Sequence, residues 1–479
     1  SDFFDARITA LMMGVGNEKR SRDSSAGQSR ERTSVSEGLK ASAKGLARRF
    51  LPRRGDKTKA QDDAFTPAGG AGAATARTEG PFPLRPFRVN ELYPVIPNKL
   101  AFTVHTSDDM TRKEIERRPD IFYCSSDYQE RYESFCADFG PIKLSELHYF
   151  VDYLKGYMEH PQLKNRLTVY YAEETPALRT NAAYLLSAYL VVELGYTPEE
   201  AWEPFAAIAG EPFLAYHDAT YCRQDYFLSI LACCQGIKKA MSLGWYVPEE
   251  FNADDYEWLD NPSNADLHRV CPKFVAFKGP SDVKTQVMDG VYTFPPHHYC
   301  EIFRELGVGA VVRLNEASTY DSRGFTENGV RHYDLEFPDC TVPPRSVVER
   351  FLEICEGEEG AIGVHCKAGL GRTGTLIAVY WMKHFGMTAS ECIGWLRVVR
   401  PGSVIGPQQQ FLEEYQERFG ERGGEGDMGR AGTAQSDTGS AECWNGTYPC
   451  AAASAAAARH MVKDNAQGLE QGTKRVIPG

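Results

Sequence analysis

An eleven-residue run, HCKAGLGRTGT at residues 365–375, constrains this chain more than any other part of its sequence. The apolar residues 361–364 before it predict a short buried strand, and residues 375–383 predict an apolar helix. Between them, Cys366 and Arg372 stand six positions apart in a loop that contains two glycines. A strand, a glycine-containing loop and a helix N-terminus form an anion-binding site, because backbone N–H groups and the helix dipole direct positive potential into the loop.

The two reactive residues of this loop suit a phosphate group. A helix N-terminus and nearby cations favour the thiolate, which is the nucleophilic form of Cys366. Arg372 offers paired N–H donors to phosphate oxygens, which a lysine does not. The alternative, a structural cysteine beside an unrelated arginine, leaves the agreement of eleven consecutive positions unexplained. The predicted phosphate-binding loop, residues 365–372, consists of His365, Cys366, Lys367, Ala368, Gly369, Leu370, Gly371 and Arg372.

A cysteine that attacks a phosphate monoester needs a proton donor for the leaving alkoxide. Asp339 is the candidate, because it follows a predicted strand at residues 331–337 and lies in a loop that ends at Pro343 and Pro344. A mobile loop of this kind carries an acid over a site. Taken alone, Asp339 has the features of a surface-turn aspartate, and the cysteine loop of the same domain is what favours the catalytic role.

The later steps need a group that positions water and a donor to the leaving sulfur. Three consecutive glutamines follow two Gly/Pro turns, and Gln408 or Gln409 is predicted to hold the hydrolytic water. Thr373 is predicted to donate a hydrogen bond to the Cys366 sulfur, with a helix N-cap as its alternative role. His365 is expected to order the loop and to favour the thiolate rather than to act as a base.

Length and charge set further bounds. At 479 residues the chain is long enough for two or three domains. Its net charge is −12, although residues 1–60 hold fourteen Lys and Arg against seven Asp and Glu. The acidic remainder argues against nucleic-acid binding and favours a substrate that brings basic residues.

Cysteine usage and hydropathy describe the environment. The chain has 13 cysteines, an odd number, without CxxC pairs or paired histidine ligands. This pattern predicts an intracellular reducing compartment and no disulfide framework, metal or cofactor. No stretch approaches eighteen consecutive apolar residues, so we expect no stable membrane insertion. Because the chain begins at Ser1 rather than Met, we expect a fragment whose N-terminal signals are not visible.

The alternation of predicted strands and helices indicates an α/β fold with two domains between disordered tails. We assign residues 1–87 to a disordered basic tail and residues 421–479 to a low-complexity tail. Residues 88–245 form the first domain, and residues 246–270 form an acidic connecting helix or linker. Residues 271–420 form the second domain, which carries the cysteine.

Specific runs predict the strands and helices of these domains. In the first domain we expect a strand at residues 167–171 and a helix at residues 180–193. In the second we expect strands at residues 273–277 and 310–314, besides the two that precede Asp339 and Cys366.

Several runs resemble one protein family. HCKAGLGRTGTLIA at residues 365–378 and RPGSVIGPQQQFL at residues 400–412 are similar to the cell-division-cycle-fourteen family of dual-specificity protein phosphatases. Residues 255–261 and 273–280 also resemble that family. The resemblance covers about residues 90–415 and implies two tandem dual-specificity-phosphatase-like domains, the first non-catalytic and the second catalytic.

The resemblance also implies an activity. The family hydrolyses phosphoserine, phosphothreonine and phosphotyrosine through a phosphocysteine, and it prefers phosphoserine followed by proline with a basic residue downstream. The implied partners are phosphoproteins modified by proline-directed kinases, and the implied roles are in mitotic exit and cytokinesis. The expected location is the nucleus or cytoplasm, including the centrosome, spindle or nucleolus, and the oligomeric state stays open.

The first domain lacks the nucleophile. Where a catalytic loop would follow its strand, residues 170–179 retain Arg179 but contain no cysteine, which favours a role in shaping the substrate site. Two helices are expected to form an acidic groove for a downstream lysine or arginine, with ordinary solvated helix faces as the alternative. The groove residues are Glu199, Glu200, Glu203, Asp254, Asp255 and Glu257.

One residue departs from the family pattern. Cys340 stands where the family usually has glycine after its general acid, and a cysteine resists the left-handed backbone that glycine permits. Under oxidation Cys340 is a candidate to pair with Cys366, the alternative being a small apolar loop residue.

Two other functions compete with a protein phosphatase. A phosphoinositide phosphatase has a similar loop, but with a second lysine where Leu370 stands in this chain. A substrate-binding pseudophosphatase scaffold would require the loss of Cys366, Arg372 or Asp339, and the chain retains all three.

Overall fold

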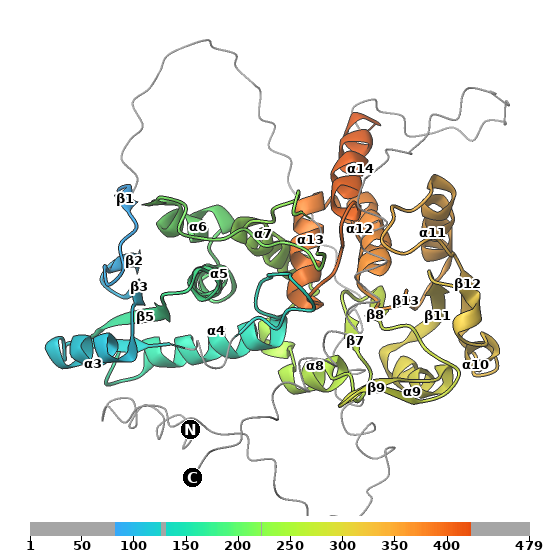
Figure 1. Ribbon diagram of the computed structural model, residues 1–479, viewed down its shortest axis with the longest axis horizontal. Helices are drawn as coiled ribbons and strands as arrows, with labels where there is room; N and C mark the ends of the chain where they lie inside the picture. The colour runs from blue at the N-terminus through green and yellow to red at the C-terminus, as the bar shows by residue number, and fades with distance from the viewer. Residues whose placement is uncertain (1–81, 126–130, 222, 423–479) are drawn as a thin grey trace, which may run out of the picture.

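The computed structural model describes residues 82–125, 131–221 and 223–422. Figure 1 shows two α/β domains side by side, the first in blue to green and the second in yellow to red. The two predicted tails lie outside the described residues except for their inner ends. Within the described part of the chain, no helix is long and apolar enough to cross a membrane.

The first domain is built on a four-stranded sheet in the order β2-β3-β5-β4, in which only the edge strand β2 is antiparallel to its neighbour. The strands are β2 (Tyr93–Ile96), β3 (Leu100–His105), β4 (Ile121–Cys124) and β5 (Leu167–Glu173). A separate parallel pair joins β1 (Arg85–Pro86) to β6 (Ile208–Ala209). Ordered structure therefore begins inside the predicted N-terminal tail.

Helix α5 shows how local sequence sets these elements. The Thr175 hydroxyl accepts a hydrogen bond from the Leu178 N–H, and Pro176 begins the helix with a suitable φ. Every residue from Thr180 to Val192 is buried, which explains the apolar run in the sequence. The helices are α3 (Asp108–Arg117), α4 (Leu144–Glu159), α5 (Pro176–Val192), α6 (Pro198–Ala206) and α7 (Ile230–Ser242).

The predicted connecting helix is only half helical. A 3-10 turn, η1 (Pro248–Glu250), precedes α8 (Ala253–Asp260), whose N-cap Asn252 accepts hydrogen bonds from two backbone N–H groups. Strand β7 (Leu267–Arg269) then pairs with the second sheet. The second domain therefore begins before residue 271, because the antiparallel edge strand lies within the segment assigned to the linker.

The second domain contains a five-stranded sheet in the order β12-β11-β13-β8-β7, parallel except for β7. Its strands are β7, β8 (Phe274–Phe277), β11 (Val308–Arg313), β12 (Arg331–Asp334) and β13 (Ala361–His365), and β9 (Thr285–Met288) and β10 (Val291–Thr293) form a hairpin. Arg313 pairs with both His365 and Asp334, so three strands end together. Ligands bind at this carboxyl edge in open α/β sheets.

Helix α12 starts four residues earlier than predicted, directly after the cysteine loop. Its C-terminus is set by Gly386, which has a left-handed φ of 59°. The helices of this domain are α9 (Pro296–Leu306), η2 (Ala317–Thr319), α10 (Arg323–Thr326), α11 (Arg345–Gly357), α12 (Gly371–Phe385), α13 (Ala389–Val399) and α14 (Gln408–Arg422).

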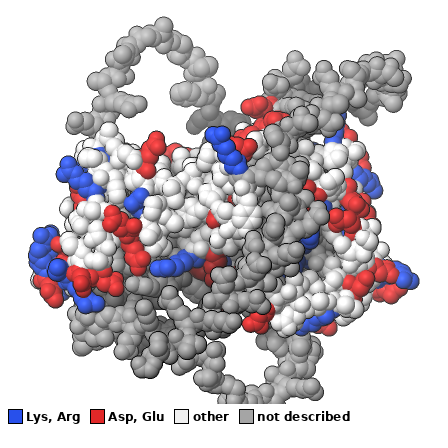
Figure 2. All heavy atoms as spheres, in the orientation of Figure 1, with Lys and Arg blue, Asp and Glu red and all other residues white. Residues whose placement is uncertain are grey.

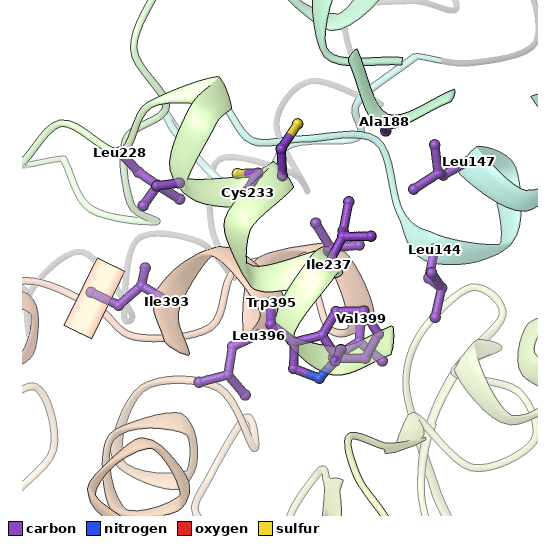
Figure 3. Packing of buried hydrophobic residues seen from close by; sticks show 14 of the residues in the cluster. Leu144, Leu147, Ala188, Leu228, Cys233, Ile237, Ile393, Trp395, Leu396 and Val399 are labelled. Atoms are coloured by element: carbon purple, nitrogen blue, oxygen red, sulfur yellow. The ribbon is translucent and has the colours of Figure 1, made fainter. Parts of the chain in front are cut away.

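The two domains share a buried core in which α7 of the first crosses α13 of the second. A β-carbon added to Gly236 would lie 2.7 Å from the Glu391 carbonyl oxygen, and one added to Gly394 would lie 2.6 Å from the Ala232 carbonyl oxygen. Figure 3 shows Trp395 of α13 packed beside α7. The two helices therefore touch backbone to backbone, which only glycine at both positions permits.

Candidate active site

The residues predicted for catalysis gather at the carboxyl edge of the second sheet. Cys366 follows β13 and is buried, and Arg372 is the second residue of α12. Asp339 lies in the loop after β12, and its carboxylate lies 3.1 Å from an Arg372 nitrogen. The structure therefore brings a thiol, a guanidinium and a carboxyl group into one site.

The peptide groups of the phosphate-binding loop are held from its outer side. The Cys366 carbonyl accepts a hydrogen bond from His365 Nδ1 at 3.0 Å, and the Lys367 carbonyl accepts one from the Gly279 N–H at 3.1 Å. In a trans peptide the N–H points opposite to the C=O. The next N–H groups along the loop therefore point inward, where an anion would bind.

Arg400 completes this arrangement. Its guanidinium donates to the Ala368 carbonyl at 3.0 Å and to the Gly369 carbonyl at 2.8 Å. Gly369 has a φ of 70°, and a β-carbon there would lie 2.0 Å from the Phe277 carbonyl oxygen, so only glycine fits.

Arg372 is anchored on one side and has a free edge on the other. Its Nη1 atom donates to the Leu314 carbonyl at 3.2 Å and to the Phe337 carbonyl at 2.8 Å. Its Nε and Nη2 atoms have no well-aligned hydrogen bond within the described residues, although the side chain is only 1% exposed. The Asp339 oxygen is close to Nη2 but lies off the N–H direction. A phosphate would satisfy this edge with two oxygens.

His365 orders the loop as a neutral side chain. Burial lowers its pKa to about 3, so the imidazole adds no positive charge at neutral pH. Because Nδ1 must donate to the Cys366 carbonyl, Nε2 accepts from the Tyr320 hydroxyl at 2.7 Å. The Tyr320 oxygen then accepts from His332 Nε2 at 2.8 Å. The expected ordering role fits this chain of bonds, whereas stabilisation of a thiolate by imidazole charge does not.

The loop between β12 and α11, residues 335–344, is called the acid loop because it carries Asp339, and its residue that departs from the family pattern has a strained backbone. Cys340 has a φ of 56°, so it adopts the left-handed backbone that glycine would favour, and its N–H lies 3.1 Å from Asp339 Oδ1. Asp339 itself is 44% exposed, as a group that must reach a substrate requires. The cysteine therefore retains the backbone shape expected of glycine, at an energetic cost.

Thr373 does not cap the helix. The N-cap of α12 is Leu370, which makes no side-chain capping bond, and Thr373 is the third helical residue. The Thr373 hydroxyl is buried and makes no hydrogen bond to any described residue, so the predicted bond to the Cys366 sulfur is not formed here. A buried hydroxyl without a partner remains available to a charge that develops during reaction.

The structure distinguishes the two candidate glutamines. Gln408 donates to the Thr341 carbonyl of the acid loop at 3.0 Å, and a β-carbon on Gly371 would lie 2.8 Å from its oxygen. Gln409 turns away and accepts from Arg397 at 2.6 Å. Gln408 is therefore the glutamine that lies between the acid loop and the phosphate-binding loop.

The two helices expected to form one acidic groove are not neighbours, so the six predicted residues do not form a single groove. Glu199, Glu200 and Glu203 are on α6, and Asp254, Asp255 and Glu257 are on α8. In Figure 1, α5 and α4 lie between α6 and α8. Spacing along the sequence does not show which charged helices become neighbours.

Several of these carboxylates also have local partners. Glu200 completes a capping box with Thr197, and Asp254 accepts a hydrogen bond from Tyr149 at 2.8 Å. Figure 2 shows acidic and basic side chains interspersed over the viewed face rather than gathered in one acidic field.

A different acidic cluster lies where α4 meets α8. Burial, together with the charges of Glu257, Glu133 and Asp260, raises the pKa of Glu146 to about 7, although Lys143 opposes the shift. Lys143 Nζ lies 2.8 Å from Glu257 and 2.8 Å from Asp260. Two of these carboxylates therefore pair with Lys143. Of the four acidic residues in this cluster, only Glu257 was predicted from the sequence.

An aromatic residue of the first domain borders the phosphate-binding loop. A β-carbon on Gly402 would lie 2.8 Å from the Phe135 ring and 3.3 Å from the Leu370 side chain. Phe135 is 46% exposed. The first domain therefore supplies an exposed apolar surface beside Leu370.

The first domain repeats the strand–loop–helix arrangement without its chemistry. Its loop between β5 and α5 has no cysteine. Arg179 Nε donates to the Pro212 carbonyl at 2.6 Å, and its guanidinium stacks over Phe87 at 4.6 Å. Arg179 therefore has a packing role here.

Both halves of the chain match family models. Residues 94–240 match the N-terminal half of dual-specificity protein phosphatases. Residues 295–418 match the dual-specificity phosphatase catalytic domain, which includes every residue of the phosphate-binding loop.

Characterised relatives agree with these matches. The chain is 44% identical to the human dual specificity protein phosphatase CDC14A over 295 residues, or 61% of this chain and 49% of that protein. It is 43% identical to mouse CDC14A over 297 residues, or 62% and 49% of the two chains. It thus spans about half the length of these relatives. It is 38% identical to human CDC14C over 324 residues, or 67% of this chain and 70% of that relative. The chain therefore belongs to the CDC14 family of dual-specificity phosphatases.

Proposed function

We propose that the chain is a protein phosphatase that hydrolyses phosphoserine, phosphothreonine and phosphotyrosine through a phosphocysteine. The free edge of Arg372 carries this proposal. A buried guanidinium with two unsatisfied nitrogens is costly unless a ligand pairs with it, and a phosphate monoester supplies two oxygens in the matching geometry.

In the first step, the Cys366 sulfur attacks phosphorus, a P–S bond forms and the P–O bond to the substrate breaks. Inward N–H groups of the loop and Arg372 hold the equatorial oxygens, where charge is spread in the transition state. Asp339 gives its proton to the departing alkoxide.

In the second step, water attacks phosphorus and the P–S bond breaks. Gln408 lies between the two loops and orients the water, while Asp339 takes its proton. The sulfur leaves as a thiolate, and the Thr373 hydroxyl is available to donate to it. The products are inorganic phosphate and the regenerated enzyme.

The surroundings of the loop support a peptide substrate. Phe135 and Leu370 offer apolar contact to a proline that follows the phosphorylated residue. The cluster of Glu133, Glu146 and Glu257 suits a basic residue further downstream. This cluster replaces the groove expected from the sequence as the candidate specificity site.

A phosphoinositide phosphatase is the second candidate, because its loop chemistry is shared. Leu370 is apolar and only 7% exposed, so it offers no charge to a second phosphate of an inositol head group. The resemblance to the family supports a role in mitotic exit or cytokinesis, with action on substrates of proline-directed kinases in the nucleus or cytoplasm.

Kinetics on matched substrates test the proposal. The panel compares pSer-Pro-x-Lys with its pThr, pTyr and acidic variants and with a phosphoinositide. We expect the highest kcat/KM on pSer-Pro-x-Lys and no turnover by Cys366→Ser. Equal rates on all peptides would refute the specificity site, and faster phosphoinositide hydrolysis would favour the second candidate. Phosphate release by Cys366→Ser would refute the covalent mechanism.

A further inference from the structure

Arg400 connects the phosphate-binding loop to the rest of the protein. It is 2% exposed and donates to the Ala368 and Gly369 carbonyls. By fixing these two carbonyls outward, it directs the N–H groups of Gly369 and Leu370 toward the bound anion. The orientation of Arg400 therefore sets the orientation of two phosphate ligands.

Arg400 is held in turn from its other side. Its Nη2 atom lies 2.9 Å from Asp266 Oδ1, and its Nη1 atom lies 2.8 Å from His268 Nδ1. A guanidinium only donates hydrogen bonds, so His268 Nδ1 is an acceptor and the imidazole proton is on Nε2. Arg400 thus fixes the tautomer of the buried His268.

The protonated nitrogen of His268 faces an aspartate of the connector. His268 Nε2 lies 3.1 Å from Asp260 Oδ1, in a contact that is short in distance but bent in direction. Burial lowers the pKa of His268, so the ring is neutral. Burial opposes ionisation of Asp260, but His268 and Lys143 outweigh it and hold the pKa of Asp260 well below its usual range.

Lys143 extends these contacts into the first domain. It precedes α4, and its Nζ atom lies 2.8 Å from Asp260 Oδ2. An unbroken line of polar contacts therefore runs from the first domain to the phosphate-binding loop, through Lys143, Asp260, His268 and Arg400.

We propose that His268 and Asp260 are positioning residues of the phosphate-binding loop, and that Lys143 of the first domain holds them in place. They act through Arg400 and touch no substrate. This inference rests on the proposed function only for its kinetic readout, because anion affinity tests it independently. It gives the non-catalytic domain a part in forming the catalytic site, besides its contact with substrate.

The test measures tungstate affinity and turnover of 4-nitrophenyl phosphate, a substrate without a basic group that the acidic cluster could bind. His268→Leu removes the acceptor for Arg400 and should weaken tungstate binding and lower kcat/KM, each by about tenfold, since a bond to a charged group is lost. His268→Asn keeps an acceptor near the Nδ1 position, so it should recover most of the tungstate affinity and most of the kcat/KM. As a single variant, Lys143→Met should weaken tungstate binding. In the double variant with His268→Leu, it should cause no further loss.

A matched control is His298→Leu, because His298 is partly buried in the same domain and bonds the Asn264 carbonyl at 2.6 Å. It should change thermal stability and leave tungstate affinity unchanged. Unchanged tungstate affinity in His268→Leu, or an equal loss in His298→Leu, would overturn the proposal.

Two further readouts cover other failures. If His268→Leu does not fold, Asp260→Asn replaces it and should also weaken tungstate binding and lower kcat/KM. If the wild-type chain hydrolyses no phosphate ester, the proposed function fails, and amide hydrogen exchange of residues 366–372 then decides. Faster exchange in His268→Leu than in His298→Leu supports positioning, and equal exchange refutes it.

Discussion

Arg372 and Asp339 face each other across the open side of the phosphate-binding loop, with 3.1 Å between Arg372 Nη2 and Asp339 Oδ1. The carboxylate thus occupies part of the guanidinium edge that a phosphate requires. Substrate binding must displace it, and the displaced carboxyl group then lies beside the leaving group. One ion pair therefore places the acid for the first step beside the guanidinium that binds the phosphate.

Asp339→Ala should separate substrates by their leaving groups. Alkyl phosphates need a proton donor and should lose about 10²- to 10⁴-fold in kcat/KM, whereas 4-nitrophenyl phosphate should lose far less, because its phenolate leaves unprotonated. Steady-state kinetics on both substrates measure this, with the exposed Glu336→Gln of the same loop as control. Equal losses on both substrates would show that Asp339 is not the acid.

Gln408→Ala should slow the second step and leave the first intact. The phosphocysteine should accumulate, seen as a burst of 4-nitrophenol followed by turnover about tenfold slower or more, as for loss of a positioned catalytic group. Gln409→Ala is the matched control, because it removes the bond to Arg397 and should lower stability without a burst. A burst in Gln409→Ala alone would reverse the assignment.

Cys340 should tolerate glycine better than a branched residue. Cys340→Gly relieves a strain of about 1–2 kcal/mol that a left-handed backbone imposes on a non-glycine residue. It also makes the unfolded chain more flexible, which costs about 0.5–1 kcal/mol of stability. The free energy of unfolding should therefore be unchanged or slightly higher. Cys340→Val should lower the free energy of unfolding by about 1–2 kcal/mol.

Chemical denaturation measures these changes, with Cys136 as a reference cysteine that lacks a positive φ. Cys136→Gly should destabilise the protein. A stabilising Cys340→Val would disprove strain at this position.

Glu146 should make stability depend on pH. Its folded-state pKa is raised from an ordinary 4.5 to about 7, so the folded chain binds a proton that the unfolded chain has released. The stabilising contribution is complete below pH 4.5 and is lost as the pH rises through 7. Between pH 5 and 8, wild type should lose on the order of 1–3 kcal/mol more than Glu146→Gln. Parallel stability curves would contradict this, and the exposed Glu116→Gln serves as control.

Local sequence was sufficient for the centre of the site. Cys366 and Arg372 lie six residues apart in one strand–loop–helix unit, so their meeting follows from local geometry alone. Asp339 was predicted because it follows a strand and lies in a loop that ends at two prolines, and the structure shows that this strand ends at the same sheet edge as β13.

Long-range contacts explain what the sequence did not show. Gln408 and Gln409 differ only in which neighbour each meets, and those neighbours, Thr341 and Arg397, come from the acid loop and from α13. The acidic groove failed for the same reason, because tertiary packing decides which charged helices adjoin. Arg400 was visible within the RPGSVIG run, but its contacts with the loop and with His268 depend on the folded sheet.

The glycine-to-glycine crossing of α7 and α13 has a consequence for how such a protein changes over generations. In a domain without a nucleophile, a residue at a catalytic position is free to take another role, as the packing role of Arg179 illustrates. Gly236 is not free in this way, because any side chain there would collide with the backbone of the catalytic half. The two halves must therefore be inherited and selected as a pair, and a first domain from a distant homologue would not dock unless its partner helix came with it.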